Sequence, residues 1–321
     1  PCDLEQGRCH AYCPKTEVDL DVLSAAWRGT PYDSGAIGHY RSVLAARAGE
    51  RMPEGVYQSG GAVSALVAFA LQTGLIEAAA LTDREGLVPV PRLVERVEDV
   101  IRCAPSKYTA APTLEALNRA VAEGRKGLGV VGTPCQMTAV SQLRLNPLER
   151  QGFEDPVSLT IGLFCTWALD MRKLASLLSD RVDASRITKM DIPPPPAEIF
   201  RVETEEQTLE IPLDEIRPAV LTGCGICPDM TSEWADISVG VLEGDEDWNT
   251  VIVRSEKGAE ILNSAVEQGW LVTREMPETG LSHLKEASMN KKVRGLKAAR
   301  EQGLLNASDE TGRSSVRLDP R

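Results

Sequence analysis

The feature that most constrains this fold is a repeated order of apolar run, turn and helix-forming segment. The apolar run 128–131 is followed by the turn 132–135 and by a helical pattern at 136–144. The same order returns with the apolar run 157–164 and a helical pattern at 169–178. Strands that alternate with helices at this spacing are typical of a parallel sheet flanked by helices. The sequence therefore predicts an α/β fold with a mostly parallel sheet.

Other segments extend this pattern along the chain. Four consecutive prolines at 193–196 mark a change of character, and a polar tail begins near residue 306. We predict four parts: a Cys-rich arm at 1–54, an α/β part at 55–190, a mixed α+β part at 191–305 and a polar tail at 306–321. The further predicted elements are helices at 62–73, 114–123, 256–268 and 281–301, strands at 77–82, 236–241, 250–254 and 270–273, and a hairpin at 200–203 and 208–211.

Composition excludes several classes of protein. The net charge of −12 argues against a nucleic-acid-binding surface. The longest apolar stretch, 62–71, is too short to cross a bilayer and is better interpreted as a buried helix. The first residues lack the basic and apolar regions of a signal peptide. We expect a soluble cytoplasmic protein without a membrane span.

The eight cysteines are the strongest indication of chemistry. With only three scattered histidines, neither a histidine metal site nor a Ser-His-Asp triad is expected. Cys135 and Cys165 each follow a predicted parallel strand, at the sheet edge where ligands collect. Cys224 and Cys227 form a Cys-x-x-Cys turn. These four thiols match the number of ligands that a 4Fe–4S cluster needs.

Other interpretations of these thiols stay open. Four thiolates also suit a structural zinc ion, and a Cys-x-x-Cys turn can be a redox dithiol. Zinc sites usually use two closely spaced pairs, whereas Cys135 and Cys165 are single and far apart, which favours a cluster. The same two residues could also be small buried hydrophobic side chains.

A second set of cysteines lies at the N-terminus. Cys9, Cys13 and Pro14 give the Cys-x3-Cys-Pro ending of bacterial ferredoxin motifs, and Cys2 precedes them by an unusual spacing. We interpret the arm as ferredoxin-like, with a possible second cluster on Cys2, Cys9 and Cys13. The alternative is a degenerate motif that has lost its cluster. Cys103 is interpreted as structural.

A glycine-containing loop and several lysines are candidates for binding anions. Ser59-Gly60-Gly61 precedes a helix, where backbone N–H groups can approach a phosphate. Lys107 could supply a positive charge, or it could be an exposed loop lysine. The basic helix at 281–301 is interpreted as a solvated face, with contact to an anionic cofactor or a partner subunit as the alternative.

Several segments together resemble the coenzyme F420 hydrogenase/dehydrogenase beta-subunit family, which also includes chlorophyll-pigment reductases. The likeness runs from about Val56 to Leu296 and rests on an ordered set of motifs. These motifs are QSGGAVSAL at 58–66, SKY at 106–108, GTPCQ at 132–136, IGLFC at 161–165, CGICPD at 224–229, ADISVG at 235–240, NTVIVR at 249–254 and the basic helix after Leu284.

The resemblance implies a FAD-binding α/β protein with a 4Fe–4S cluster beside the flavin. By this likeness Cys135, Cys165, Cys224 and Cys227 ligate the cluster. The expected FAD contacts are Ser59, Gly60, Gly61, Ser64, Lys107 and Thr133.

The implied function is electron transfer between iron–sulfur clusters and FAD, to or from a two-electron carrier such as coenzyme F420. The implied partners are ferredoxin and a hydrogenase, formate dehydrogenase or heterodisulfide-reductase-like subunit. Two alternatives remain at this point. One is a stand-alone ferredoxin-dependent reductase of a pigment or other small molecule, and the other is a zinc-stabilised α/β interaction protein.

Overall fold

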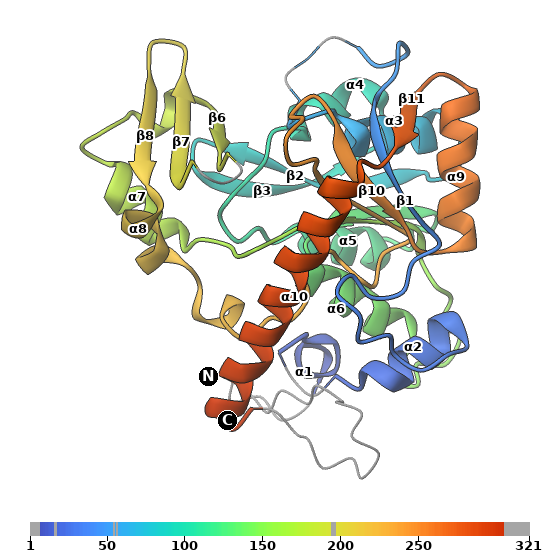
Figure 1. Cartoon of the computed structure of the whole chain (residues 1–321). Helices are drawn as coiled ribbons and strands as arrows, with labels where there is room; N and C mark the ends of the chain where they lie inside the picture. Colours follow the sequence, from blue (N-terminus) through green and yellow to red (C-terminus); the bar gives the residue numbers. More distant parts are fainter. Residues whose placement is uncertain (1–6, 16–17, 54, 56, 194–196, 305–321) are drawn as a thin grey trace.

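The structure is a computed structural model that describes residues 7–15, 18–53, 55, 57–193 and 197–304 (Figure 1). Cys2 and the predicted tail at 306–321 lie outside the described residues. The helices are α1 (Arg8–Tyr12), α2 (Leu20–Arg28), α3 (Ala62–Gln72), α4 (Val97–Val100), α5 (Thr113–Ala122), α6 (Pro134–Arg144), α7 (Met171–Leu178), α8 (Leu213–Ile216), α9 (Glu256–Glu267) and α10 (Glu278–Glu301).

An eight-stranded mixed sheet forms the centre of the molecule, with the strand order β11-β1-β10-β9-β5-β4-β2-β3. The four inner strands β9, β5, β4 and β2 run parallel. The strands on both sides of them pair antiparallel. The bounds are β1 Ser42–Ala48, β2 Ala78–Glu85, β3 Val88–Val94, β4 Leu128–Gly132, β5 Val157–Leu163, β9 Ile237–Val241, β10 Asn249–Val253 and β11 Leu271–Glu275.

Helices cover both faces of this sheet because its inner strands are apolar on both sides. In β2, Ala79 and Leu81 belong to one buried cluster, together with α3 and α9. Ala78 and Ala80 belong to a second cluster, together with α5 and α6. Residues that alternate along a strand point to opposite faces, so β2 contributes to both cores. The result is a three-layer α/β arrangement.

A second, three-stranded sheet lies to one side of the main sheet (Figure 1). Its strands are β6 (Ile187–Asp191), β7 (Ile199–Thr204) and β8 (Thr208–Pro212). Its buried core includes Phe200, Val202 and Leu174, the last of which lies on α7.

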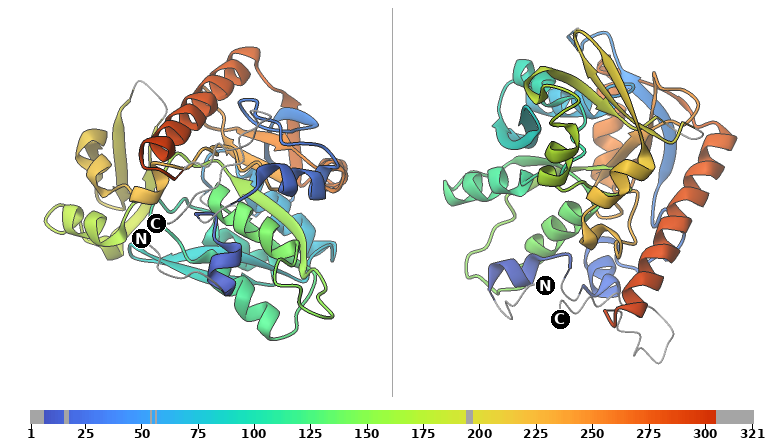
Figure 2. Two further views of the ribbon diagram at one scale, coloured as in Figure 1. Left: turned by 90° about the horizontal axis from the view of Figure 1, so that it is seen from below. Right: turned by 90° about the vertical axis from the view of Figure 1, so that its left-hand side faces the viewer.

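The long helix α10 crosses the outside of the molecule and ends beside the N-terminal segment (Figures 1 and 2). Ala299, near its end, belongs to the same buried cluster as Val18 and Leu23 of that segment. The segment around α2 and the last turns of α10 thus pack in one buried cluster.

The predicted α/β class is confirmed, and every helix and strand predicted above has a counterpart within a few residues. The sheet is more mixed than predicted, because parallel pairing is confined to its centre. It also crosses the expected boundaries near 54 and 190, since β1 comes from the arm and β9 to β11 come from the C-terminal part. None of the helices in the described ranges has the length and apolar character needed to span a bilayer.

Candidate functional site

The carboxyl ends of the parallel strands form the edge at which the predicted site residues gather. Cys135 lies in the first turn of α6, directly after β4, and Cys165 follows the end of β5. Thr133 begins α6 with a capping box, in which its backbone N–H donates to Gln136 Oε1 at 2.9 Å. This cap fixes the turn that carries Cys135. The two cysteines occupy the edge expected from the sequence.

Cys224 and Cys227 reach the same edge from a loop beyond the second sheet. Ala168 N donates to Cys224 Sγ at 3.4 Å, and Leu221 N donates to Ala168 O at 3.0 Å. Cys165 N donates to Met230 O at 2.9 Å. These bonds join the loop after β5 to the loop that contains the Cys-x-x-Cys turn. The cysteines predicted as one set therefore lie on adjoining segments.

The other three thiols lie close enough to Cys165 to affect its pKa. Burial raises the pKa of the Cys165 thiol to about 12, and the positive charge of Lys291 opposes this rise. The neighbouring thiols Cys135, Cys227 and Cys224 raise it further. Burial also raises the pKa of Cys135, which the Thr133 hydroxyl at 3.3 Å opposes. Thiols held in this state become thiolates when a metal or cluster binds them.

The spacing of these groups bears on the kind of metal that they suit. Within the described ranges, no three His, Cys, Asp or Glu side chains are arranged to hold a metal ion. A single zinc ion brings all its thiolates to one atom, whereas a 4Fe–4S cluster takes one thiolate on each iron and spreads them further apart. Four cysteine thiols supply the number of ligands that either group needs. Ligation by these four cysteines stays a prediction.

Cys9 lies on the short helix α1, and Cys13 follows its end. Cys9 is exposed, whereas Cys13 is half-buried and its Sγ accepts a hydrogen bond from Lys15 N at 3.4 Å. Gln142 of α6 donates to Tyr12 O at 3.4 Å, which holds α1 against α6. Burial raises the pKa of Cys135, and the positive charge of Lys15 is close enough to oppose that rise, so the arm reaches the edge site. A second cluster on Cys2, Cys9 and Cys13 stays a prediction, and Cys2 lies outside the described residues.

The Ser59-Gly60-Gly61 loop is packed against the β9–β10 connection. Ser59 Oγ donates to Glu246 O at 2.7 Å or to Trp248 O at 2.9 Å. A Cβ on Gly60 would lie 2.8 Å from Asp247 O, so only glycine fits there without displacing this backbone. Asn249 Oδ1 accepts a bond from the first N–H of α3 at 3.0 Å. Close packing accounts for Gly60, and a role in binding phosphate stays a prediction.

Lys107 and its neighbours lie near the end of β2 and beside the second sheet. Lys107 Nζ donates to Cys103 O at 2.6 Å, and burial lowers its pKa to about 8. Gln58 Nε2 donates to Asp191 Oδ1 at 2.9 Å, and Ser106 N donates to Gln58 Oε1 at 3.4 Å. The structure thus brings the 58–61 loop and the 106–108 segment together. Ser64, by contrast, is buried within α3.

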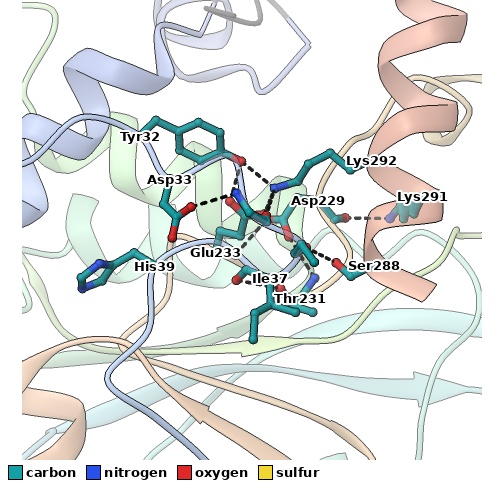
Figure 3. A network of polar contacts seen from close by, with 12 residues as sticks. Tyr32, Asp33, Ile37, His39, Asp229, Thr231, Glu233, Ser288, Lys291 and Lys292 are labelled. Atoms are coloured by element: carbon teal, nitrogen blue, oxygen red, sulfur yellow. Dashed lines mark hydrogen bonds and ion pairs between the residues drawn. The ribbon is translucent and has the colours of Figure 1, made fainter. Parts of the chain in front are cut away.

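A buried polar network beside the thiols was not predicted from the sequence (Figure 3). Glu233 pairs with Lys292 at 2.8 Å, and their side chains are 1% and 6% exposed. Tyr32 OH donates to Glu233 Oε2 at 2.6 Å. Burial raises the pKa of Glu233, and the negative charge of Asp229 adds to that rise. The interpretation of the basic helix as solvated is therefore wrong for Lys291 and Lys292, which are both buried.

A cavity of about 40 Å³ separates this network from the thiols. Its lining includes Cys135 and Cys227 together with Tyr32 and Glu233. Lys15 from the arm also borders it. The network and the thiol edge are therefore one continuous region, although their residues come from distant parts of the chain.

The fold and the site define an α/β protein with cysteine thiols at the parallel-strand edge of its sheet. Two sequence profiles then match, described as the N-terminal part (residues 43–118) and the C terminus (residues 125–279) of the coenzyme F420 hydrogenase/dehydrogenase beta subunit. The chain belongs to this family of oxidoreductase subunits.

Individual relatives agree with this assignment. The chain is 31% identical over 278 residues to the coenzyme F420 hydrogenase subunit beta of Methanothermobacter thermautotrophicus, covering 84% of this chain and 98% of that protein. It is 34% identical over 221 residues to the coenzyme F420-dependent sulfite reductase of Methanocaldococcus jannaschii, covering 64% of this chain and 34% of that protein. It also resembles a chain of the F420-reducing [NiFe] hydrogenase complex from Methanosarcina barkeri, with a TM-score of 0.76 and 28% identity over 84% of this chain and 94% of that one.

Proposed function

We propose that this chain is an iron–sulfur flavoprotein that transfers electrons as one subunit of a larger redox complex. It would hold a 4Fe–4S cluster on Cys135, Cys165, Cys224 and Cys227. The observation that carries the proposal is that these four thiols, spread over ninety-odd positions of the printed sequence, lie within electrostatic reach of one another at one sheet edge. Four cysteines at one edge are the ligand set of such a cluster.

The proposed flavin site adjoins the thiols along the same edge. Thr133 is a proposed flavin contact, and its hydroxyl also lies 3.3 Å from Cys135 Sγ. The 58–61 loop and Lys107 would bind the phosphates or the ring of FAD. Gly60, Gly61 and Ser64 lie at the start of α3, where Gly61 is the N-cap. A bound cluster supplies one-electron transfers, and a bound flavin supplies both one- and two-electron transfers. The chain's task is to hold the two groups side by side.

The proposed two-electron carrier is coenzyme F420, or a partner redox subunit in its place. The relatives named above are subunits or enzymes linked to that coenzyme by name, which supports this choice. The proposed partners are ferredoxin and a hydrogenase, formate dehydrogenase or heterodisulfide-reductase-like subunit. The arm, which packs on α6 beside the thiols, is a suitable place for electrons to enter.

The proposal is tested by purifying the full chain without oxygen and recording its absorbance, iron, sulfide and flavin content. We expect about four irons and four sulfides for the edge site, and about one FAD per chain, by ligand counting. Bleaching of the visible absorbance by a reductant should follow. A colourless protein that contains about one zinc would contradict the proposal and favour a zinc-stabilised interaction protein.

The charge on Lys107 gives a prediction about pH. Its pKa of about 8 means that the ammonium loses its proton as the pH rises through 8. A charged hydrogen bond contributes about 1.5–3 kcal/mol, so FAD should bind at least about tenfold more weakly at about pH 9.5 than at about pH 6.5. Equilibrium dialysis of the flavin at each pH measures this. Lys107→Met should bind weakly at both pH values.

The pH dependence of the free energy of unfolding tests the lowered pKa of Lys107 in protein without flavin. Burial lowers the folded pKa of Lys107 below its ordinary value of 10.5. The unfolded chain therefore binds more protons between about pH 8 and pH 10.5, and this lysine's contribution makes the protein more stable as the pH rises through that range. Lys107→Met should remove that component of the pH dependence. Equal FAD affinity at both pH values in the native protein would exclude Lys107 as a flavin contact.

A further inference from the structure

Lys291 is a buried lysine on α10 that contacts both segments carrying the proposed cluster ligands. Lys291 is only 4% exposed. Its Nζ donates to Cys165 O at 2.5 Å and to Asp229 O at 2.7 Å. Asp229 follows Cys227 by two residues. Figure 3 shows Lys291 pointing from the helix toward Asp229. A single ammonium group thus joins the loop after β5 to the Cys-x-x-Cys loop.

The charge of Lys291 has no carboxylate partner among the described residues. It forms no ion pair there, whereas its neighbour Lys292 pairs with Glu233 at 2.8 Å. The Asp229 carboxylate is directed elsewhere, since its two oxygens accept Thr231 N and Glu233 N, each at 2.9 Å. A buried cation paired only with carbonyl oxygens is costly, because carbonyl dipoles replace only part of its hydration.

The position of α10 holds this cation against the thiols. Gly295 lies one helical turn after Lys291, on the same face of α10. A Cβ at Gly295 would lie 2.7 Å from Cys227 O, so the helix backbone is in direct contact with the Cys-x-x-Cys loop. The positive charge of Lys291 also opposes the raised pKa of the Cys165 thiol. The ammonium is thus fixed beside the thiols.

We infer that Lys291 is a positioning residue that provides the counter-charge of the proposed cluster and raises its reduction potential. The inference rests on the proposed function. A 4Fe–4S cluster with four thiolates carries net negative charge, which increases by one when it is reduced, and charge is one of the factors that set its potential. A buried cation is weakly screened, so it stabilises the reduced form more than the oxidised form.

The test is a redox titration of the full chain, followed by electron paramagnetic resonance, with Lys291→Met as the main variant. Methionine keeps an unbranched apolar stem and removes the charge. We expect the cluster to assemble and its reduction equilibrium constant to fall about tenfold, which is about 59 mV for a one-electron couple. Lys291→Arg should keep a potential close to that of the native protein. An unchanged potential in Lys291→Met with full iron content would overturn the inference.

Lys285→Met is the matched control, because Lys285 is an exposed lysine on the same helix. Its removal should leave the potential unchanged, since solvent screens its charge. If Lys291→Met contains no iron, the Lys291→Arg variant decides. Iron retained in Lys291→Arg supports a need for the positive charge, whereas iron lost from Lys291→Arg overturns the inference. Native protein that binds no iron at all would instead overturn the proposed function. The two failures are therefore distinguishable.

Discussion

Replacing Cys224 with serine should remove about four irons and four sulfides from each chain, the content of one cluster. The other three edge thiols would remain, but a cubane that loses one of four protein ligands is exposed to exchange and breakdown. The fold should persist, because Cys224 is only half-buried and lies in a short turn held by backbone hydrogen bonds. Iron and sulfide analysis, with far-ultraviolet circular dichroism, measures both outcomes.

Cys103→Ser is the control for this experiment. Cys103 is also half-buried, and burial raises its pKa to about 11, but it is not one of the proposed cluster ligands and lies beside Lys107. Its carbonyl, which accepts the Lys107 bond, is unaffected by the change of side chain. We expect full iron content in Cys103→Ser. Equal iron content in Cys224→Ser and native protein would show that Cys224 is not a ligand.

Lys292→Met should be strongly destabilising, although Lys292 lies outside the thiol set. It leaves the Glu233 carboxylate, which is 1% exposed, without its cation. Breaking a buried pair in this way costs about 3–5 kcal/mol of the free energy of unfolding. Urea denaturation monitored by fluorescence measures the loss. It should become smaller as the pH is lowered, because burial raises the pKa of Glu233 and protonation then removes the unpaired charge.

Two further variants identify the cause of that loss. Glu233→Gln combined with Lys292→Met should recover part of the stability, because the amide can still accept the bond from Tyr32 OH. Lys297→Met should change the free energy of unfolding by less than about 0.5 kcal/mol, since Lys297 and its partner Glu301 are both well exposed. If Lys292→Met were as stable as Lys297→Met, the buried pair would not contribute to stability.

The sequence could predict those parts of the fold whose pattern is local. β4 and β5 are continuous apolar runs with turn residues after them, so the positions of Cys135 and Cys165 at one edge followed from strand direction alone. β1, by contrast, was missed. Its sequence SVLAARA has neither a strict alternation nor many β-branched residues, and it is recognisable as a strand only through its pairing with β10 and β11.

The burial of Lys291 and Lys292 could not be predicted for a similar reason. Both lie in a basic helical run whose other charged residues, such as Lys285 and Arg294, are exposed. The partners of Lys291 lie 126 and 62 residues away in sequence. Only the tertiary structure shows that one stripe of this helix faces the thiols. The Cys224–Cys227 pair was recognisable because its turn is local, but its closeness to Cys165 again depends on the fold.

The place of β1 in the sheet has a consequence for how the protein is made. β1 pairs with β10 on one side, Ser42 opposite Val253, and with β11 on the other, Ala48 opposite Leu271. As the chain leaves the ribosome, this strand emerges long before either partner and has both edges open, which is an aggregation hazard. Lys291 emerges later still. We expect nascent chains to need chaperone protection, and delivery of any cluster to follow the completion of synthesis rather than accompany it.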